Sequence, residues 1–558
     1  MENLVGNVHE EEKRELDYTE LPDDPSHHDS IVVIYSESEL YRSGFSLKKL
    51  LHHMGPGFLM CIAFVDPGNL EADLQTGAHT GYSLLWLLLW STAMGMLLQS
   101  LATRLGVVTG RHLAQHCRAK YPLPVRITLW LMAELAIIGS DIQEVIGAAI
   151  ALLLLSGGTL PLWAGVIIAA VGAYLLLLLE KFGSRWLEVL FQLLVASLAV
   201  TMGILFFDAQ VPYAEVVRGL VVPHLDGRSV PLAAALLGSI VMPHNLFLHS
   251  ALVHDRRLPQ SYRHLGLRES LYYYNLEALI ALCVTLGINV AVISVFAKGF
   301  HGHKHEADKI GLENAGKYLG KRFGRHMQII WAIGLLAAGQ SSTMTGTYAG
   351  QFVMSGYLNL KMNAATRALL TRAVALGPTL LVALTTRENS RGLDVLSQWI
   401  NVLQSVQLPF AIIPLLALTS DRALMGIGFV NSRATTIICW VVALGIMAVN
   451  GGVAYQTAVE RLPAIGGFTH VLFWGVVVFY IAFVVYLAIT SVQYPPERIL
   501  MKEGNDGEEY DEAGMVHGSL PPLEIPRPSS PPIEVPLDSS RSVLSSHAIG
   551  GKYGSTSA

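Results

Sequence analysis

The chain alternates long apolar runs with short polar connections over most of its length. About twelve runs approach the ~20 residues that a helix needs to cross a hydrocarbon core. They lie at approximately 55–78, 83–104, 126–154, 160–180, 186–207, 230–254, 271–297, 327–356, 366–386, 393–419, 434–457 and 467–490. The pattern predicts an all-α polytopic membrane protein with about twelve transmembrane helices and excludes an ordinary soluble domain.

Two of these runs are interrupted in the same way. The first contains Asp66–Asn69 (Asp-Pro-Gly-Asn), and the sixth contains Met242–Asn245 (Met-Pro-His-Asn). In each, a candidate metal ligand precedes a proline and an asparagine follows that proline by two positions. Backbone without helical hydrogen bonds is tolerated in a bilayer only where it is buried in protein or lines a cavity. The two interruptions therefore predict an interior binding site of the kind that transporters carry.

Both ends of the chain differ in composition from the middle. Residues 1–45 are rich in Glu, Asp, Ser and His, and residues 491–558 carry three Pro-Pro pairs among Ser, Glu and Gly. Such segments cannot bury a core, so we predict two disordered cytosolic tails around a transporter domain at 46–490. Tyr18–Leu21 fits the tyrosine-plus-bulky-apolar pattern that sorting adaptors bind, although this pattern often arises by chance.

The basic residues predict the orientation in the membrane. Lys and Arg gather in the loops after even-numbered runs, and the loops after the first and third runs have none. By the positive-inside rule, both termini are cytosolic. The exception is the basic segment 298–326 on the predicted outer side, where the length of the loop weakens the charge signal.

Composition narrows the class further. The sequence is 52% hydrophobic and 15% charged, with a mean hydropathy of +0.44 and a net charge of −5, which does not favour nucleic acid as a partner. The four cysteines form no CxxC pair, so we expect buried apolar side chains rather than disulfides or a thiolate metal site. The acidic, polar start predicts no cleavable signal peptide.

The interruptions supply a specific set of candidate ligands. Asp66 is an ionisable group inside a span, Pro67 breaks the helix and frees carbonyls near Ala63, and Asn69 adds an amide oxygen. The thioether of Met242 is a soft ligand that transition metals accept and that has little to offer Ca²⁺ or Mg²⁺. Together these groups indicate a site for Mn²⁺ or Fe²⁺. The alternative is a proline kink with a buried polar pair and a gap-filling methionine.

The third run carries three carboxylates along one side of a helix: Glu134, Asp141 and Glu144. This arrangement suits a proton relay, and a buried ion-pair network with Arg256, Arg257 or Arg372 is a compatible alternative. His244 could also relay protons. For His249, a purely structural role is equally open.

Two further stretches have open interpretations. His301, His303 and His305 could collect metal at the outer mouth or be incidental. The polar run Gly339–Gln351 could serve transport or close helix packing. We find no Walker motif, nucleophile elbow or nucleotide-binding glycine loop, which argues against an ATP-driven pump or an enzyme.

Residues 50–490 resemble the natural resistance-associated macrophage protein (Nramp) family of proton-coupled divalent metal transporters. Asp66–Asn69, Met242–His244 and Gly339–Gln351 look like the motifs of that family. The resemblance implies a LeuT-like fold: inverted repeats at about 55–207 and 230–419, then two peripheral helices at about 434–490.

The resemblance also implies roles for individual residues. It implies a metal site made of the Asp66, Asn69 and Met242 side chains, the carbonyls of Ala63 and Ser239, and an amide of the tenth span. We place that amide at Asn401, although Gln398, Gln404 and Gln407 compete. The implied proton pathway comprises Asp66, Glu144 and Asp141, with His244, Glu134, Arg256 and Arg372 as accessory positions.

We therefore expect a proton-coupled symporter that imports Mn²⁺ or Fe²⁺, and also Cd²⁺ or Co²⁺, into the cytosol by alternating access. Metal ions and protons are its cargo, and no resident cofactor is expected. The alternatives are an Nramp-like membrane sensor and a sodium-coupled amino-acid symporter of the same fold. The plasma membrane, endosome and vacuole all remain open as locations.

Overall fold

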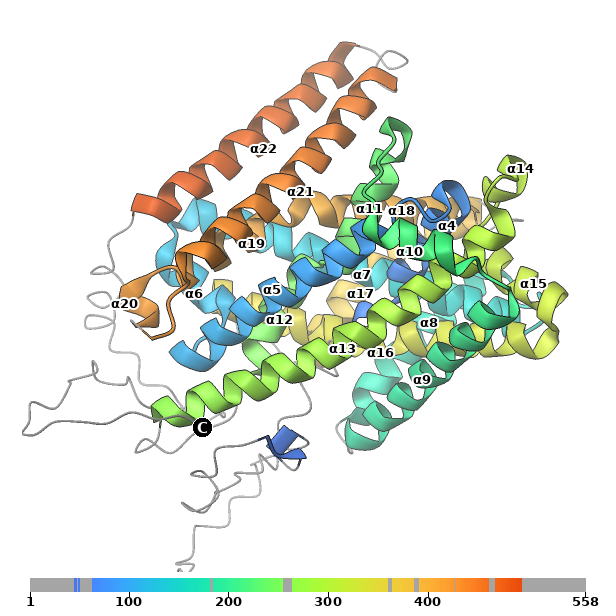
Figure 1. Cartoon of the computed structure of the whole chain (residues 1–558), viewed down its shortest axis with the longest axis horizontal. Coiled ribbons are helices and arrows are strands. Elements are labelled where there is room, and N and C mark those ends of the chain that lie inside the picture. Colours follow the sequence, from blue (N-terminus) through green and yellow to red (C-terminus); the bar gives the residue numbers. More distant parts are fainter. Residues whose placement is uncertain are drawn as a thin grey trace, which may run out of the picture. The chain divides into compact units, whose positions relative to one another are not determined.

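The computed structural model describes residues 45–47, 49–50, 63–180, 184–253, 263–359, 364–385, 391–426, 428–460 and 467–493. Nearly all of the two predicted tails, including Tyr18–Leu21, therefore lies outside the described residues. The described residues are helical with short connections and contain no strand (Figure 1).

Helices occupy the predicted apolar runs, with ends that differ from the expected ones by a few residues. Residues 55–62 of the first run fall outside the described part. The helices are α4 (Pro67–Thr80), α5 (Leu85–Thr109), α7 (Leu123–Leu155), α8 (Leu162–Glu180), α9 (Ser184–Asp208), α11 (Val230–Ile240), α12 (Pro243–Leu252), α13 (Arg263–Phe300), α16 (Arg325–Leu358), α17 (Ala364–Thr385), α18 (Arg391–Gln407), α19 (Pro409–Thr419), α21 (Arg433–Glu460) and α22 (Gly467–Gln493).

Shorter helices lie between these spans: α6 (Leu113–Lys120), α10 (Tyr213–Val221), α14 (Lys304–Ala307), α15 (Leu312–Phe323) and α20 (Arg422–Met425). Within the described ranges, seven helices are long and apolar enough to cross a membrane. An eighth span counts if α9 and α10, bent by 116°, are taken together.

Prolines set the starts of three helices near the centre. α4, α12 and α19 begin at Pro67, Pro243 and Pro409, because proline is tolerated in the first turn of a helix but not in its interior. The first two match the predicted interruptions. The third lies in the run at 393–419, in which the sequence analysis marked no interruption.

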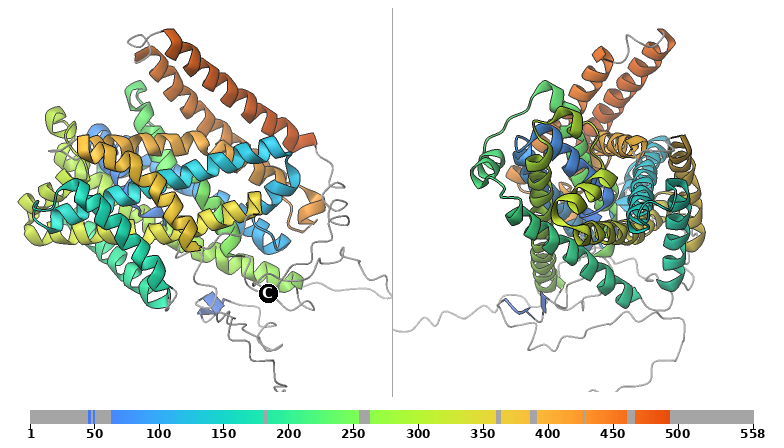
Figure 2. Two further views of the ribbon diagram at one scale, coloured as in Figure 1. Left: turned by 180° about the vertical axis from the view of Figure 1, so that it is seen from behind. Right: turned by 90° about the vertical axis from the view of Figure 1, so that its right-hand side faces the viewer.

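A central group of helices surrounds the two predicted interruptions. α4 packs against α7, α11, α13 and α18, and α7 packs against α16 and α18. α21 and α22 lie at the edge of the bundle in all three views (Figures 1 and 2), and only 11% of the apolar window of α22 is buried. These are the two peripheral helices that the fold class predicts.

Two large apolar clusters and a small third one fill the interior, and buried polar residues occur where helices pass from one large cluster to the other. In α7, Ile137 belongs to the first cluster and Ile142 to the second. The break at Asp66 likewise follows Phe64 of the first cluster and Val65 of the second. We call the buried polar residues at these crossings the polar belt: Asp66, Asn69, Asp141, Gln143, Glu144, Asn401, Gln404 and Ser405.

Close packing of α11 on α18 leads to a first prediction. A Cβ at Gly238 would lie 1.9 Å from the Asn401 carbonyl oxygen and 2.7 Å from the Ser405 nitrogen, and neither backbone atom can rotate away. Gly238→Ala should therefore destabilise the fold by about 1–3 kcal/mol. Thermal unfolding in detergent measures the effect.

Gly445→Ala in α21 is the matched control, because nothing lies within 4 Å of its Cβ position and alanine favours a helix. Equal unfolding temperatures for the two variants would contradict the packing described here.

Candidate metal site and proton pathway

Asp66 caps the N-terminus of α4. Its Oδ1 accepts a hydrogen bond from the Asn69 amide at 2.7 Å, and Asn69 Nδ2 donates to the Phe64 carbonyl at 2.8 Å. Both side chains are fully buried. Asp66 Oδ2 and Asn69 Oδ1 have no hydrogen-bond partner within the described part of the chain. The first interruption thus presents two buried oxygens that a cation could satisfy.

The two prolines also free backbone carbonyls. Proline has no N–H, so Pro67 and Pro243 cannot donate to the carbonyls four residues before them. Those carbonyls belong to Ala63 and Ser239, the two that the family resemblance implies as ligands. Both residues are buried. Each break therefore offers a carbonyl that has lost its helical donor.

Met242 is the N-cap of α12 and is buried, which places its side chain at the second interruption. α11, which ends two residues before it, packs against both α4 and α18. The second interruption therefore belongs to the same central group as the first.

Asn401 of α18 links these elements. Its Nδ2 donates to the Gly68 carbonyl at 2.9 Å, and its own carbonyl lies against Gly238 of α11. Its Oδ1 accepts from Gln143 Nε2 at 2.7 Å. Four amides of α18 were candidates for this ligand position. Among the described contacts, Asn401 is the one of the four that forms a hydrogen bond to the Asp66–Asn69 stretch.

Gln143 is a residue to which sequence analysis gave no role. Its Nε2 also donates to the Ser397 carbonyl at 3.0 Å, so it joins α7 to α18 beside the candidate site. A Cβ at Gly68 would lie 2.6 Å from its Oε1, so the glycine admits this side chain. A polar amide within an apolar span was the available signal.

Two of the three carboxylates of α7 face α16. Glu144 Oε2 accepts from Thr343 Oγ1 at 2.8 Å, and Glu144 Oε1 accepts from Ser140 Oγ at 3.2 Å. A Cβ at Gly346 would lie 3.4 Å from Asp141 Oδ1 and 3.6 Å from Glu144 Oε1. Both acids therefore contact the polar run of α16. In this run, Thr343 donates a hydrogen bond and the small residue Gly346 allows close packing.

The third carboxylate, Glu134, forms an ion pair with a residue that we had not named for this role. Its Oε1 lies 2.6 Å from Arg367 Nη2 of α17, and Arg367 is buried. A small cavity is lined by Arg367, Asp141, Ile137, Gly346, Thr347 and Thr371, and so connects this pair with Asp141. Arg256 and the side chain of Arg372 lie outside the described residues.

The histidines have separate environments. His244 is buried, and its Nδ1 has no partner among the described residues. His249 Nε2 lies 2.7 Å from Thr103 Oγ1, which fits the structural role. His301, His303 and His305 are all exposed; the first two follow the end of α13 and the third lies in α14. No group of three or more His, Cys, Asp or Glu residues that could hold a metal occurs in the described ranges.

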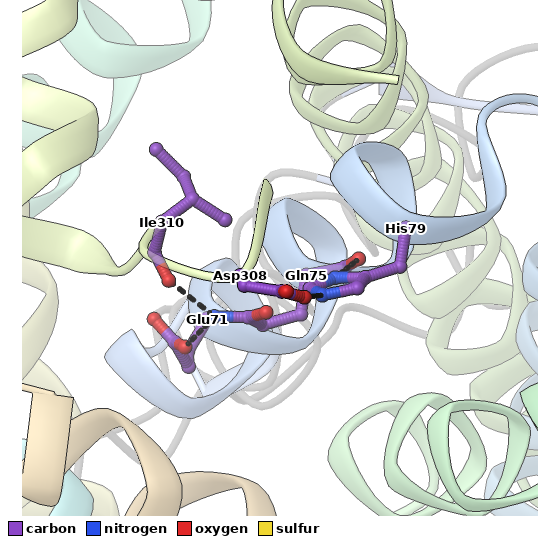
Figure 3. Close-up of polar contacts among 5 residues, drawn as sticks. All are labelled: Glu71, Gln75, His79, Asp308 and Ile310. Carbon is purple, nitrogen blue, oxygen red and sulfur yellow. Dashed lines mark hydrogen bonds and ion pairs between the residues drawn. The ribbon is translucent and has the colours of Figure 1, made fainter. Parts of the chain in front are cut away.

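The predicted outer half of α4 is tied to the connection between α14 and α15. Gln75 Nε2 donates to the Ile310 carbonyl and to Glu71 Oε1, both at 2.7 Å (Figure 3). One turn further along, His79 Nε2 lies 3.5 Å from Asp308 Oδ1 (Figure 3). Movement of α4 would therefore have to break these contacts.

The fold and the apolar helices define a multi-pass integral membrane protein in which α4 and α12 begin at the prolines of two interrupted spans. The family profile described as natural resistance-associated macrophage protein-like matches residues 57–456, and the chain belongs to the Nramp family. This confirms the resemblance inferred from the motifs.

The chain is similar to proteins named metal transporters over most of their length. The chain is 49% identical over 456 residues to metal transporter Nramp2 of Oryza sativa subsp. japonica, covering 81% of this chain and 86% of that protein. It is 50% identical over 461 residues to metal transporter Nramp3 of Arabidopsis thaliana, covering 81% and 88%. A crystal structure of an Eremococcus coleocola manganese transporter variant is similar at a TM-score of 0.71 with 28% identity, covering 82% of this chain and 97% of that one. The LeuT-like fold class is thereby confirmed.

The Glu134–Arg367 pair gives a second prediction. Removing one member of a buried pair leaves an unpaired charge and costs about 3–5 kcal/mol. Arg367→Met should therefore lower the unfolding temperature in detergent. Arg367→Met combined with Glu134→Gln should recover much of the loss, because no buried charge is then stranded. A double variant no more stable than the single one would contradict the pairing.

Proposed function

We propose that this protein is a proton-coupled symporter that moves Mn²⁺ or Fe²⁺ into the cytosol by alternating access. The observation that carries the proposal is the pair of buried, unpartnered oxygens at the first break, Asp66 Oδ2 and Asn69 Oδ1. A cation satisfies such oxygens without the cost of leaving them unpaired. The names of the relatives, metal and manganese transporters, support the same class of cargo.

The proposed ligand set is mixed in character. Asp66, Asn69 and the Ala63 and Ser239 carbonyls supply hard oxygen, and Met242 supplies a soft sulfur. Hard cations such as Ca²⁺ lose hydration oxygens and gain a poor ligand in the thioether, whereas Mn²⁺ and Fe²⁺ accept it. Asn401 would join the set through Oδ1, by exchanging the hydrogen bond that this oxygen accepts from Gln143 for the metal. Cd²⁺ and Co²⁺ fit the same ligands.

The proposed proton route runs beside the metal. Metal binding at Asp66 disfavours protonation there, so a proton would be displaced toward Glu144 and Asp141. The hydrogen bond from Thr343 and the cavity shared by Asp141 and Arg367 support this direction. The accessory positions of the proposed proton pathway remain His244, Glu134, Arg256 and Arg372. Arg367 is added as the ion-pair partner of Glu134.

The two alternatives fit less well. An amino-acid symporter would hold the substrate carboxylate at a half-helix N-terminus, but Asp66 accepts the Asn69 amide at the N-terminus of α4 and would repel that carboxylate. A membrane sensor is expected to have lost the metal motifs, whereas Asp66, Asn69 and Met242 are all present here.

Removing the carboxylate tests the function directly. Asp66→Ala should reduce Mn²⁺ uptake into proteoliposomes by about tenfold or more, because the only charged ligand is lost. Vesicles loaded with a pH dye report whether protons enter with the metal. Asp226→Asn, at an exposed carboxylate, is the control. Wild-type uptake by Asp66→Ala would overturn the proposal.

The selectivity role of the thioether has its own test. In Met242→Ala, the ratio of Ca²⁺ transport to Mn²⁺ transport should be about tenfold higher than in the wild type. This is the size of effect expected from the loss of one ligand. Met202→Ala, a fully buried methionine of α9 in an apolar cluster, controls for lost volume. An unchanged ratio in Met242→Ala would mean that sulfur does not select the metal.

A further inference from the structure

The helix α21 lies at the edge of the bundle (Figure 1) but carries one polar side chain, Asn450, that is buried inside it. Asn450 Nδ2 donates to the Ser405 carbonyl of α18 at 2.9 Å, and Asn450 Oδ1 accepts from Ser405 Oγ at 2.8 Å. Asparagine side chains in membrane-spanning helices commonly form such bonds between helices. One amide of α21 is therefore held by two reciprocal hydrogen bonds to one residue of α18.

Ser405 needs a partner because of the proline that follows it. Pro409 begins α19 and has no N–H, so the Ser405 carbonyl four residues earlier receives no helical hydrogen bond. α18 ends at Gln407, which places a break between the two helices directly after Ser405. Hinges between rigid elements consist of a few such residues at helix ends. By occupying the freed carbonyl, Asn450 fixes the end of α18 at this break.

The fixed end of α18 lies one helical turn, ~6 Å along the axis, from the proposed ligand Asn401. A Cβ at Gly238 of α11 would lie 2.7 Å from the Ser405 nitrogen and 1.9 Å from the Asn401 carbonyl oxygen, so one close contact holds both residues. From there the Asn401 side chain reaches Gly68 and Gln143. The position of Ser405 therefore sets the position of the Asn401 amide.

α21 also packs against the metal-site helices through apolar side chains. The small third cluster joins three helices and contains Ala234 and Ala235 of α11, Val402 of α18 and Val453 of α21, with Val449 of α21 packed against it. Val449 and Val453 stand on either side of Asn450 in the sequence. The part of α21 that surrounds Asn450 thus contacts the helix that leads to the second interruption and the helix that carries Asn401.

We propose that Asn450 is a positioning residue of the metal site. By holding Ser405, it fixes the break between α18 and α19 and so places the Asn401 amide beside the Asp66–Asn69 stretch. The inference rests on the proposed transport function, in which Asn401 is a ligand. Asn450 is not a ligand itself, because both polar atoms of its side chain are used by Ser405.

This role predicts a particular kinetic effect. Without the amide of Asn450, the last turn of α18 is free to rotate at Pro409, and Asn401 is less often in place to bind the metal. The KM for Mn²⁺ should then rise, whereas the maximal rate should change little, because a saturating metal concentration restores the bound state.

Two variants of α21 separate hydrogen bonding from packing. Asn450→Leu keeps a side chain of similar size and removes both hydrogen bonds. Ile446→Ala, one turn earlier in the first apolar cluster, removes buried volume and leaves the bonds in place. With full-length protein in proteoliposomes, Asn450→Leu should raise the KM for Mn²⁺ about tenfold, the effect of losing a residue that orients a metal ligand. Ile446→Ala should keep the KM of the wild type. Unfolding temperatures in detergent verify that both variants are folded.

A double variant tests whether Asn450 acts through Asn401. Calorimetric titration with Mn²⁺ in detergent gives a Kd even where uptake is lost. Asn401→Ala should weaken Mn²⁺ binding, and adding Asn450→Leu to it should cause no further loss, because no amide is left to position.

Three results would each overturn the inference: an unchanged KM in Asn450→Leu, an equal rise in Ile446→Ala, or a further loss of binding in the double variant. Failure of the proposed function gives a different result, namely no Mn²⁺ uptake by the wild type or normal uptake by Asp66→Ala. Neither of these measurements involves Asn450, so the two failures are distinguishable.

Discussion

Every proline inside a span removes one backbone donor, and the carbonyl left behind must find another partner away from water. Three central breaks meet this requirement differently. At Pro409, the affected carbonyl belongs to Ser405 and accepts from Asn450 Nδ2 of α21 at 2.9 Å, while Ser405 Oγ donates back to Asn450 at 2.8 Å. Protein atoms thus satisfy the third break. At Pro67 and Pro243, by contrast, the carbonyls of Ala63 and Ser239 stand beside buried ligand-type side chains, and a metal ion is the partner that we propose.

The polar belt depends on helices that cross between two apolar clusters. Because each crossing helix contributes its polar residues at the same transition, side chains distant in sequence can pair there, as Gln143 does with Asn401 and Glu144 with Thr343. The small residues Gly68, Gly238 and Gly346 let the helices approach closely enough for these contacts. The residues of this layer therefore hold the buried charges, let the helices pack closely and provide partners for freed backbone groups. A change that separates α11 from α18 also disturbs the ligands.

Much of this arrangement could be predicted locally. Hydropathy placed the spans within a few residues. The two motifs with proline marked the breaks at Asp66 and Met242, because a proline in the sequence always means the loss of a backbone N–H donor. Three features could not be predicted. Arg367 resembles other loop-flanking basic residues until its pairing with Glu134 is seen. Gln143 acquires its role only through α18. Pro409 looks no different from Pro378, which lies inside α17 without dividing it.

The sequence by itself determined the class of protein, its family, the two broken helices and the chemical types available as ligands. These follow from properties of single segments: apolar length, proline position and the side chains beside it. Only the tertiary structure decided which polar groups meet. Asn401 contacts Gly68, Arg367 pairs with Glu134, and Asn450 pairs with Ser405 because α18 packs against α4, α17 against α7 and α21 against α18. Such pairings depend on helix rotation and close approach, which are set by contacts between segments far apart in the chain.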